Sequence, residues 1–425
     1  SRLAAVLSAG GVGRGDRVSY LGLNSPTFLA TYLASAWVGA IFLPVNFRLS
    51  AEEVHKILAD AGVHTRVAEA GHARVAEAAT GRLDVRRLLV DDDPNDPAEG
   101  APDSRWESLS RLVAAASERP EPLPCGQDDP GLLVYTSGTT GRAKGVPLTH
   151  GNLWWNCVAL DTAAGRRTDD VNLVVAPLFH TAPFASFALR TLTRGGTNII
   201  RRAFEAGQAL ADLSSYRVNT FFAVPAMYRA IARAPGFASA DLSALQVAVT
   251  AGAPAPPQVI AEYADRGVLL QQAYGLTEVL FATCVPAFKT REKLGSVGVP
   301  LPFVEIRLTK PGTDEPITEP GVPGEVCIRS PSATKGYFQN PEATALAFTA
   351  ERWFHSGDIG QLDPDGFLFI VDRAKDMIIV AGDNVYSGEV ERVLAGFPGV
   401  GEVAVVGVPD GTWGEVVVAA VTVEE

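Results

Sequence analysis

The sequence has few cysteines, and their spacing already excludes some classes of protein. The four are Cys125, Cys157, Cys284 and Cys327, and no two of them form a CxxC pair. Without such clustering we expect neither a disulfide framework nor a structural zinc site. Each cysteine is predicted to be a small buried apolar residue.

Long apolar runs are also missing. Segments such as residues 416–421 fall far short of the ~20 residues that a membrane-spanning helix needs. We find no signal-peptide pattern. The expectation is a soluble, cytoplasmic protein without a membrane span.

Positive charge is the third shortage. Lys and Arg number 36 against 48 for Asp and Glu, so the net charge is −12. A broad nucleic-acid-binding surface would be basic, so nucleic acid is excluded as an expected partner. A local phosphate site remains compatible with this charge, because a few backbone amides and one or two cations can hold an anion inside an acidic protein.

Strand and helix patterns alternate over most of the 425 residues, a length that suggests about three folding units. Ser50 and Glu53 have capping-box spacing at the start of one predicted helix. Alternation at this spacing favours parallel sheets covered by helices. The strands expected in this part cover residues 17–23, 41–45, 172–176, 197–200, 219–223, 246–250 and 268–270.

The pattern changes after about residue 296. Residues 304–308 and 325–329 alternate with period two between turns, which indicates an antiparallel β unit. Beyond residue 372 a short strand (377–380), a helix (387–397) and two valine-rich strands predict a small α+β module. The chain opens in mid-helix and closes inside a strand, so we expect residues to be missing at both ends.

The loop over residues 135–145 is rich in glycine and hydroxyl groups. Glycines let backbone amides converge on a ligand, and hydroxyls and a lysine add donors, as a polyphosphate requires. It is not a P-loop, because Gly145 rather than Ser or Thr follows Lys144; a plain linker is the alternative. The candidate residues are Thr136, Ser137, Gly138, Thr139, Thr140, Gly141 and Lys144.

A second segment, residues 271–278, follows an apolar run. Tyr274 could stack on a base, and Gly275 would allow close approach of a ligand. Thr277 could meet a phosphate and Glu278 could hold Mg²⁺. Taken alone, the segment is equally compatible with an ordinary strand–turn–helix.

A third pair, Asp358 and Arg373, suits a ribose and a phosphate, because a carboxylate can accept both ribose hydroxyls and an Arg can bridge ribose and phosphate. Separately, each would be read as a solvated turn or a surface ion pair.

In this order the three segments resemble the adenylate-forming superfamily, which comprises acyl-CoA synthetases, peptide-synthetase adenylation domains and luciferase-like enzymes. The resemblance runs from about residue 15 to the end and is closest to the acyl-CoA synthetases. It implies an α/β fold with a large N-terminal domain of two helix-covered sheets plus a β-rich subdomain (1–372). A hinge (373–376) and the start of a small mobile α+β C-terminal domain (377–425), incomplete here, would follow.

The resemblance also implies roles for residues. Lys144, Thr277, Glu278 and His180 would act in catalysis, with Glu278 as the Mg²⁺ ligand, and Lys375 would lie at the hinge. Besides residues 136–144, the implied ATP-binding and CoA-binding residues are Gly252, Ala253, Pro254, Gln272, Ala273, Tyr274, Gly275, Thr277, Asp358 and Arg373, with Ala381, Gly382 and Asp383 at the entry of the pantetheine thiol.

For the acid, the resemblance makes His180 a gate between the acyl pocket and the thiol tunnel, although an isolated histidine is more often a core residue. Pro183 departs from many relatives, which have glycine there. The implied pocket is mostly apolar, so we expect a hydrophobic monocarboxylic acid, with fatty, aryl and polycyclic acids all left open. Its residues are His180, Pro183, Phe184, Ala223, Met227, Ala251, Gly252, Leu276, Leu280 and Phe281.

The implied reaction is ATP-dependent conversion of the acid to acyl-AMP with release of pyrophosphate, followed by transfer to the thiol of coenzyme A. ATP, Mg²⁺ and coenzyme A would be the cofactors, and fatty acid metabolism one setting. The main alternative is a stand-alone adenylating enzyme that loads the phosphopantetheine of a carrier protein. A luciferase-like oxygenase and a nucleotide-binding scaffold are further readings. Homodimers are common among similar enzymes, and the sequence leaves the oligomeric state open. A further family lysine would lie beyond Glu425.

Overall fold

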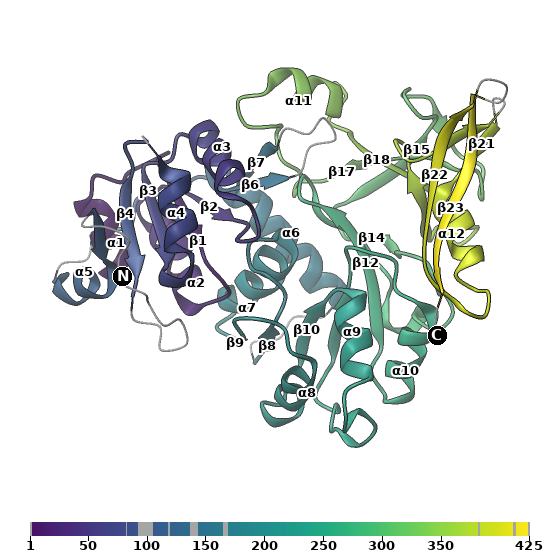
Figure 1. The fold of residues 1–425 in the computed structure, drawn as a ribbon, viewed down its shortest axis with the longest axis horizontal. Coiled ribbons are helices and arrows are strands. Elements are labelled where there is room, and N and C mark those ends of the chain that lie inside the picture. Colours follow the sequence, from purple (N-terminus) through teal and green to yellow (C-terminus); the bar gives the residue numbers. More distant parts are fainter. Residues whose placement is uncertain are drawn as a thin grey trace.

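The computed structural model describes residues 2–81, 83–91, 105–117, 120–136, 143–164, 169–380, 383–410 and 414–423. Within these ranges the strands form four sheets, two of them large. Figure 1 shows the first large sheet next to the N-terminus, the second in the middle of the molecule, and the smallest sheet at the opposite end. The predicted fold class, a mixed α/β architecture with a small C-terminal unit, is confirmed.

The first sheet has the strand order β5-β4-β3-β1-β2-β6-β7. Its pairs are parallel except for β6 with β7. The sequence patterns found β1 and β2 but missed β3, β4, β5 and β7, which lie in less regular apolar stretches. The strands are β1 Arg17–Leu21, β2 Ile41–Val45, β3 Thr65–Glu69, β4 Arg86–Val90, β5 Trp106–Ser108, β6 Pro130–Thr136 and β7 Lys144–Thr149.

Helices cover both faces of this sheet. Helices α1 (Arg2–Ala9) and α2 (Pro26–Trp37) pack on one face, and α3 (Ala51–Ala61) and α4 (Ala73–Thr80) on the other. The predicted capping box of α3 is present, with the Ser50 side chain accepting from the Glu53 amide and the Glu53 carboxylate accepting from the Ser50 amide. A short turn and a further helix complete this part: η1 Ala70–His72 and α5 Leu109–Ala115.

The second sheet has the order β14-β13-β12-β11-β10-β8-β9, parallel from β8 to β12 and antiparallel at β13 and β14. Most expected strands lie within a residue or two of their predicted positions. The exception is β12, which begins where the expected strand 268–270 ends and continues to Leu276. The strands are β8 Val171–Val174, β9 Thr197–Ile200, β10 Thr220–Ala223, β11 Val247–Thr250, β12 Leu270–Leu276, β13 Leu280–Cys284 and β14 Val299–Pro300.

Apolar side chains divide around this sheet by face. Helices α8, α9 and α10 pack on one face through residues such as Leu213, Tyr228 and Tyr263. Helix α6 and a π-helix, η2, pack on the other face with Phe187 and Phe222. The helices and turns are α6 His150–Ala164, η2 Ala182–Ala188, α7 Leu189–Thr193, α8 Ala206–Ser215, α9 Pro225–Ala232, η3 Phe237–Ser239, α10 Pro257–Asp265 and η4 Ala287–Lys289.

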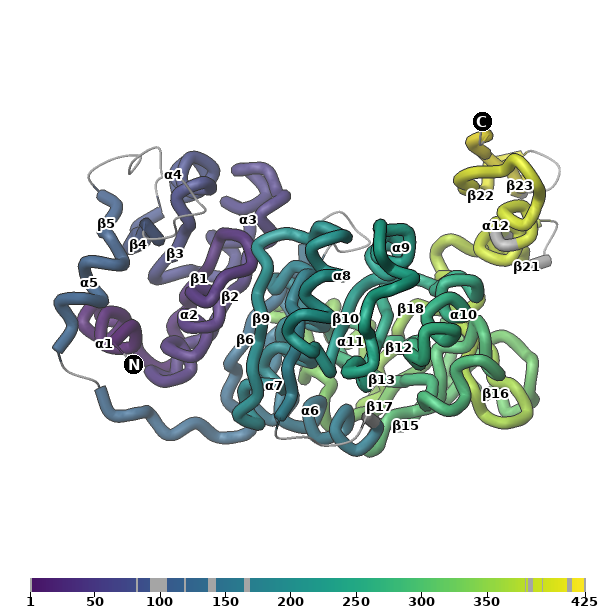
Figure 2. The backbone as a smooth tube through the Cα atoms, turned by 90° about the horizontal axis from the view of Figure 1, so that it is seen from below, coloured from purple at the N-terminus to yellow at the C-terminus, as the bar shows by residue number. Residues whose placement is uncertain are grey.

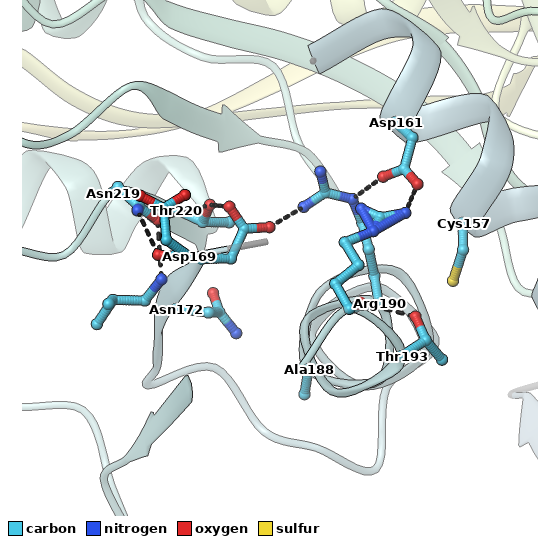
Figure 3. A network of polar contacts seen from close by, with 12 residues as sticks. Cys157, Asp161, Asp169, Asn172, Ala188, Arg190, Thr193, Asn219 and Thr220 are labelled. Atoms are coloured by element: carbon cyan, nitrogen blue, oxygen red, sulfur yellow. Dashed lines mark hydrogen bonds and ion pairs between the residues drawn. The ribbon is translucent and has the colours of Figure 1, made fainter. Parts of the chain in front are cut away.

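A buried polar network holds the π-helix and α7 in place (Figure 3). The guanidinium of Arg190 is 1% exposed; its Nε donates to Asp161 Oδ1 at 2.7 Å and its Nη1 to Asp170 Oδ2 at 3.3 Å. These bonds tie α7 to α6 and to the segment that enters β8. Removing one partner of such a pair leaves a buried charge uncompensated, at a cost of about 3–5 kcal/mol.

The third sheet is antiparallel, as predicted, with the order β16-β15-β17-β18-β19; the fourth has the order β21-β20-β23-β22. Figure 2 shows the fourth sheet and α12 standing at one end of the molecule, far from the N-terminus. The elements are β15 Glu305–Thr309, β16 Pro316–Ile317, β17 Gly324–Arg329, α11 Pro341–Ala347, β18 Phe354–Leu362, β19 Leu368–Arg373, β20 Ile378–Val380, β21 Asp383–Val385, α12 Ser387–Leu394, β22 Val400–Asp410 and β23 Gly414–Val423.

The structure shows where the few cysteines lie and whether any described helix could span a membrane. All four cysteines are free, and three are buried as predicted, but Cys125 is exposed in an extended segment that follows α5. Among the described residues, none of the helices combines the length and the apolar character needed to cross a membrane.

Candidate active site

Predicted site residues gather at the carboxyl ends of parallel strands in the second sheet. Strands β10, β11 and β12 are adjacent, so Ala223, the 251–254 loop and the turn after Leu276 follow one another along a single edge. Ligands of parallel α/β sheets bind outside this edge, because the loops that leave it are free to surround them.

The turn from β12 into β13 depends on Gly275. The register shifts between Tyr274 and Gly275, and Leu280 has a positive φ of 59°. A Cβ on Gly275 would lie 1.9 Å from the Leu280 carbonyl oxygen. Only glycine fits this approach, and the tight turn brings Thr277 and Glu278 to the edge of the sheet.

Tyr274, Asp358 and Arg373 form one cluster, as the sequence predicted for three parts of one site. The Tyr274 hydroxyl donates to Asp358 Oδ2 at 2.7 Å, and Arg373 Nε lies 3.4 Å from Asp358 Oδ1. Asp358 and Arg373 are cross-strand partners in β18 and β19. Burial raises the pKa of the Asp358 carboxyl, and the Tyr274 hydrogen bond and the Arg373 charge oppose that rise.

Glu278, the predicted metal ligand, is 9% exposed. Its Oε1 accepts from the Tyr337 hydroxyl at 2.9 Å. Burial raises the pKa of Glu278, and its hydrogen bonds and the charge of Lys144 counteract this.

The described residues hold no group of three or more His, Cys, Asp or Glu side chains placed to bind a metal. Mg²⁺ commonly uses one or two carboxylates together with substrate phosphates and water. A single carboxylate at Glu278, near enough to Lys144 to feel its charge, fits that donor set.

Lys144 and Thr136 are cross-strand partners at the ends of β7 and β6, so they flank the predicted phosphate loop. The ammonium of Lys144 lies 4.8 Å from the centre of the Tyr337 ring. A hollow of about 130 Å³ beside it is lined by Lys144, Gly145 and Asp60, among others. Five predicted residues lie outside the described part of the chain: Ser137, Gly138, Thr139, Thr140 and Gly141.

The sequence analysis missed Tyr337, which lies in a segment that we call the 334–340 strap. The strap is bonded on both sides: the Thr334 amide donates to the Glu278 carbonyl at 2.7 Å, and the Phe338 amide donates to the Gly145 carbonyl at 2.8 Å. A glycine followed by two aromatic residues between β17 and α11 was the available signal. It lay in a stretch that the sequence patterns predicted to be strand-rich with turns, and no site was assigned to it.

Two of the predicted ATP-binding segments, 252–254 and 272–274, follow or lie on the neighbouring strands β11 and β12. Gly252 has a φ of +87°, and Ala253 and Pro254 are exposed. Gln272 Oε1 accepts from the Ala255 amide at 3.2 Å, which ties the 252–254 loop to β12. Ala273 is buried.

His180 lies after β8, away from the Tyr274 cluster in sequence but on the same side of the sheet. Its ring packs against Phe179 at 4.2 Å between centroids, while the residue keeps an exposed edge. Partial desolvation, followed by the charge of Arg48, lowers the pKa of His180. The neutral imidazole is therefore the favoured form near neutral pH.

Aromatic rings form one wall beside the predicted acyl pocket. Phe187 of the π-helix stacks on Phe222 at 5.0 Å, and Phe281 meets both edge-to-face at 6.0 Å. Phe187 and Phe222 were not predicted. A π-helix is a rare device that re-aims side chains, often at functional sites, and nothing in its sequence announces it.

The remaining predicted pocket residues are divided between this wall and the core. Phe184 is 1% exposed and packs among Phe28, Tyr32 and Phe42, so it joins the π-helix to the first sheet. Its role as a pocket residue stays a prediction. Pro183, Ala223, Ala251 and Leu280 are buried, and Met227 and Leu276 are half-buried.

The predicted hinge residue Lys375 is exposed, 4.0 Å from Asp376. The turn around it is held by the Ala374 amide, which donates to the Gly357 carbonyl at 2.9 Å. Asp372 accepts from the Ser387 hydroxyl at 2.9 Å and so contacts the start of α12. Of the predicted thiol-entry residues, Ala381 and Gly382 are outside the described part, and Asp383 begins β21.

A larger hollow, of about 360 Å³, lies elsewhere, between α6 and α7. Trp154, Cys157 and Arg194 are among its lining residues, and none of the predicted site residues is. We therefore place the candidate site at the sheet edge, where the polar groups converge, and not at this hollow between α6 and α7.

Comparison with known proteins identifies the family of this chain. The family described as AMP-binding enzyme matches residues 1–338, and its C-terminal domain matches residues 389–425. The chain is 46% identical over 418 residues to a feruloyl-CoA synthase of an Amycolatopsis species, which covers 98% of this chain and 80% of the relative. It is 36% identical over 423 residues to an indoleacetate–CoA ligase of Aromatoleum aromaticum, which covers 99% and 81%.

Among solved structures, ATP-bound MatB from Rhodopseudomonas palustris superposes with a TM-score of 0.90 at 30% identity, covering 100% of this chain and 81% of that one. Matches of this extent and identity establish the family as well as the fold. The chain belongs to the AMP-binding enzymes of the adenylate-forming superfamily, and within it to the AMP-forming acid–CoA ligases.

Proposed function

We propose that this protein uses ATP to activate an aromatic monocarboxylic acid as its acyl-AMP and then transfers the acyl group to coenzyme A. The proposal rests on one observation: polar side chains suited to a nucleotide and a wall of aromatic rings lie at the same sheet. The polar cluster of Tyr274, Asp358 and Arg373, with Glu278 in the turn after β12, lies at the edge of the sheet whose π-helix-covered face carries the Phe187–Phe222–Phe281 wall.

In the first step a carboxylate oxygen attacks the α-phosphorus of ATP and pyrophosphate leaves. The two reactants are both anionic, so positive charge and hydrogen-bond donors are required. Lys144 would face the leaving phosphates, Thr277 the α-phosphate, and Asp358 with Arg373 the ribose. When bound at Glu278, Mg²⁺ would supply further positive charge.

In the second step a thiolate attacks the acyl carbonyl and AMP leaves. The acyl-AMP is already an activated mixed anhydride, so a side-chain nucleophile is not required. His180 would act as a gate at this step. Lys375 would serve as the hinge on which residues 377–425 turn relative to the domain of residues 1–372.

The proposed class of acid rests on the Phe187–Phe222–Phe281 wall and on the names of the two relatives. The pocket residues predicted here carry no side-chain charge apart from His180, whose neutral form is favoured. Flat rings match the edge-to-face and stacked geometry of the phenylalanines. The relatives named above are a feruloyl-CoA synthase and an indoleacetate–CoA ligase, and both names carry an aromatic acyl group.

The test is a panel of acids assayed for ATP-dependent pyrophosphate release and, in parallel, for thioester formation. We expect the enzyme to use cinnamic, phenolic cinnamic and indolic acids far better than fatty acids. The fatty acids in the panel have about eight to sixteen carbons, so that they are as long as the aryl acids or longer. Release of pyrophosphate without acyl-CoA would favour loading of a carrier protein instead. Preference for the fatty acids would refute the aromatic assignment.

A paired variant tests the site itself. Lys144→Ala with Asp358→Ala removes the predicted phosphate cation and the predicted ribose acceptor. ATP binding measured by calorimetry should be abolished. Retained binding would mean that the nucleotide lies elsewhere.

A further inference from the structure

Tyr337 stands between two groups that the proposed function needs to keep apart. Its hydroxyl donates to Glu278 Oε1 at 2.9 Å, and its ring face carries the Lys144 ammonium at 4.8 Å. Lys144 and Glu278 are close enough for the lysine charge to act on the carboxylate. Their opposite charges would otherwise favour a direct ion pair at this largely buried place.

A direct ion pair would disable both groups. A lysine bound to Glu278 could not turn to a phosphate, and a carboxylate bound to Lys144 would have its oxygens occupied when a cation arrives. With Tyr337 present, each group has a neutral partner. The hydroxyl satisfies one carboxylate oxygen, and the ring face holds the ammonium by a cation–π contact.

The backbone fixes Tyr337 in this position. The Tyr337 amide donates to Thr344 Oγ1 at 2.9 Å, which ties the 334–340 strap to α11. As described above, the same strap is bonded to the Glu278 backbone on one side and to Gly145, next to Lys144, on the other. The ring is therefore held by the two elements whose side chains it separates.

We infer that Tyr337 is a positioning residue that keeps Lys144 directed to phosphate and Glu278 directed to the metal. The inference rests on the proposed function, since it takes Lys144 and Glu278 as the phosphate and Mg²⁺ groups. It adds a separate role: the hydroxyl acts on the metal half of the site, and the ring acts on the phosphate half.

Because the Tyr337 hydroxyl and ring have separate roles, measurements of ATP binding can test each role. ATP affinity is measured by calorimetry with and without Mg²⁺, on the full chain. Tyr337→Phe keeps the ring and loses the hydroxyl, so ATP affinity without metal should stay unchanged. The gain in affinity that Mg²⁺ confers should fall by about 10-fold, as is typical when an outer partner of a metal ligand is lost. Tyr337→Leu removes the ring as well, so ATP affinity without metal should also fall.

Tyr135→Phe is the matched control. It too deletes a tyrosine hydroxyl that donates to a carboxylate, at 2.6 Å to Asp60, in the strand that leads to the phosphate loop. Its hydroxyl donates to Asp60 on α3, so the Mg²⁺ effect should be as in the unmodified protein. Thermal unfolding of all three variants is recorded to show that they are folded.

The outcomes separate the inference from the function on which it rests. If the unmodified protein binds ATP and Mg²⁺ strengthens that binding equally in Tyr337→Phe, the positioning role is wrong and the proposed function stands. If affinity with and without metal falls by the same factor in Tyr337→Phe, Tyr337 is merely structural. If the unmodified protein binds no ATP, both ideas are overturned.

Discussion

The nucleotide half and the acyl half of the candidate site are built in different ways. In the nucleotide half, polar side chains from distant segments are joined by specific bonds, such as Tyr274 to Asp358 and Tyr337 to Glu278. In the acyl half, phenylalanines from η2, β10 and β13 meet by packing.

The contrast has a physical reason. A nucleotide presents the same phosphates and ribose to every member of such a family, so single bonds in fixed places serve it. An acid varies in size and shape, and a packed apolar wall changes its shape with one or two substitutions. Variants in the first half should therefore abolish the reaction, and variants in the second should redirect it.

The largest effect is expected at Asp358. Asp358→Ala removes the partner of Arg373, whose side chain is 58% exposed, and the buried acceptor of the Tyr274 hydroxyl. Truncating one member of such a pair costs about 3–4 kcal/mol, or roughly 100–1,000-fold in acid-dependent pyrophosphate release. Asp365→Ala, in the exposed turn of the same hairpin, is the control and should be near normal. An effect on Asp358→Ala below tenfold would contradict the cluster's role.

Next in size is Gly275. Gly275→Ala places a Cβ against the Leu280 carbonyl at 1.9 Å, so the turn that carries Thr277 and Glu278 must shift. We expect the melting temperature to fall by roughly 2–6 °C and the rate by about 100-fold. Gly13→Ala, with open space around its Cβ position, should change neither. A normal rate in Gly275→Ala would show that the turn tolerates displacement.

A smaller effect, confined to the acid, is expected in the aromatic wall. Phe281→Leu keeps an apolar side chain and removes the edge-to-face contacts with Phe187 and Phe222. The KM for an aryl acid should rise about 10-fold, with the KM for ATP unchanged. Phe288→Leu, whose parent side chain is 80% exposed, is the control. If both KM values rise together, the two halves are not separable as described.

The smallest expected effect is on the titration of His180. Arg48 is a cause, after desolvation, of the lowered pKa of His180. Arg48→Ala should therefore raise that pKa toward its ordinary value and extend the protonated form to higher pH. NMR titration of the ring proton measures this directly, with His150, lowered by burial without Arg48, as an internal control. An unchanged or lower pKa for His180 would contradict the electrostatic explanation.

Sequence reasoning reached the nucleotide half because its signals are local. The stretch from Tyr274 to Glu278 is continuous, and Asp358 and Arg373 stand out as residue types even before their strands are known. Tyr337 was missed, because its position depends on a backbone hydrogen bond between the 334–340 strap and Gly145 that no spacing in the sequence encodes. The boundaries of β12, and the strands β3, β4, β5 and β7, were missed for the related reason that pairing partners decide them.

The residues of the acyl half were predicted less well, because they carry no distinctive local signal. Phe184 and Phe187 are three residues apart on η2, yet Phe184 packs with Phe28 and Tyr32 in the first layer, and Phe187 packs with Phe222 beside the second sheet. A phenylalanine is equally apolar in either place.

By itself, the sequence determined which chemical groups are available. The chain is acidic overall and has few cysteines and no long apolar run. It also carries one set of glycines, hydroxyls, carboxylates and cations suited to a nucleotide. Those are properties of residue type and short spacing, which survive without coordinates. The tertiary structure decided which of these groups share a site and which only fill the core. Register, a π-helix turn and a strap bonded on two sides are products of long-range packing, so they become visible only when the chain is folded.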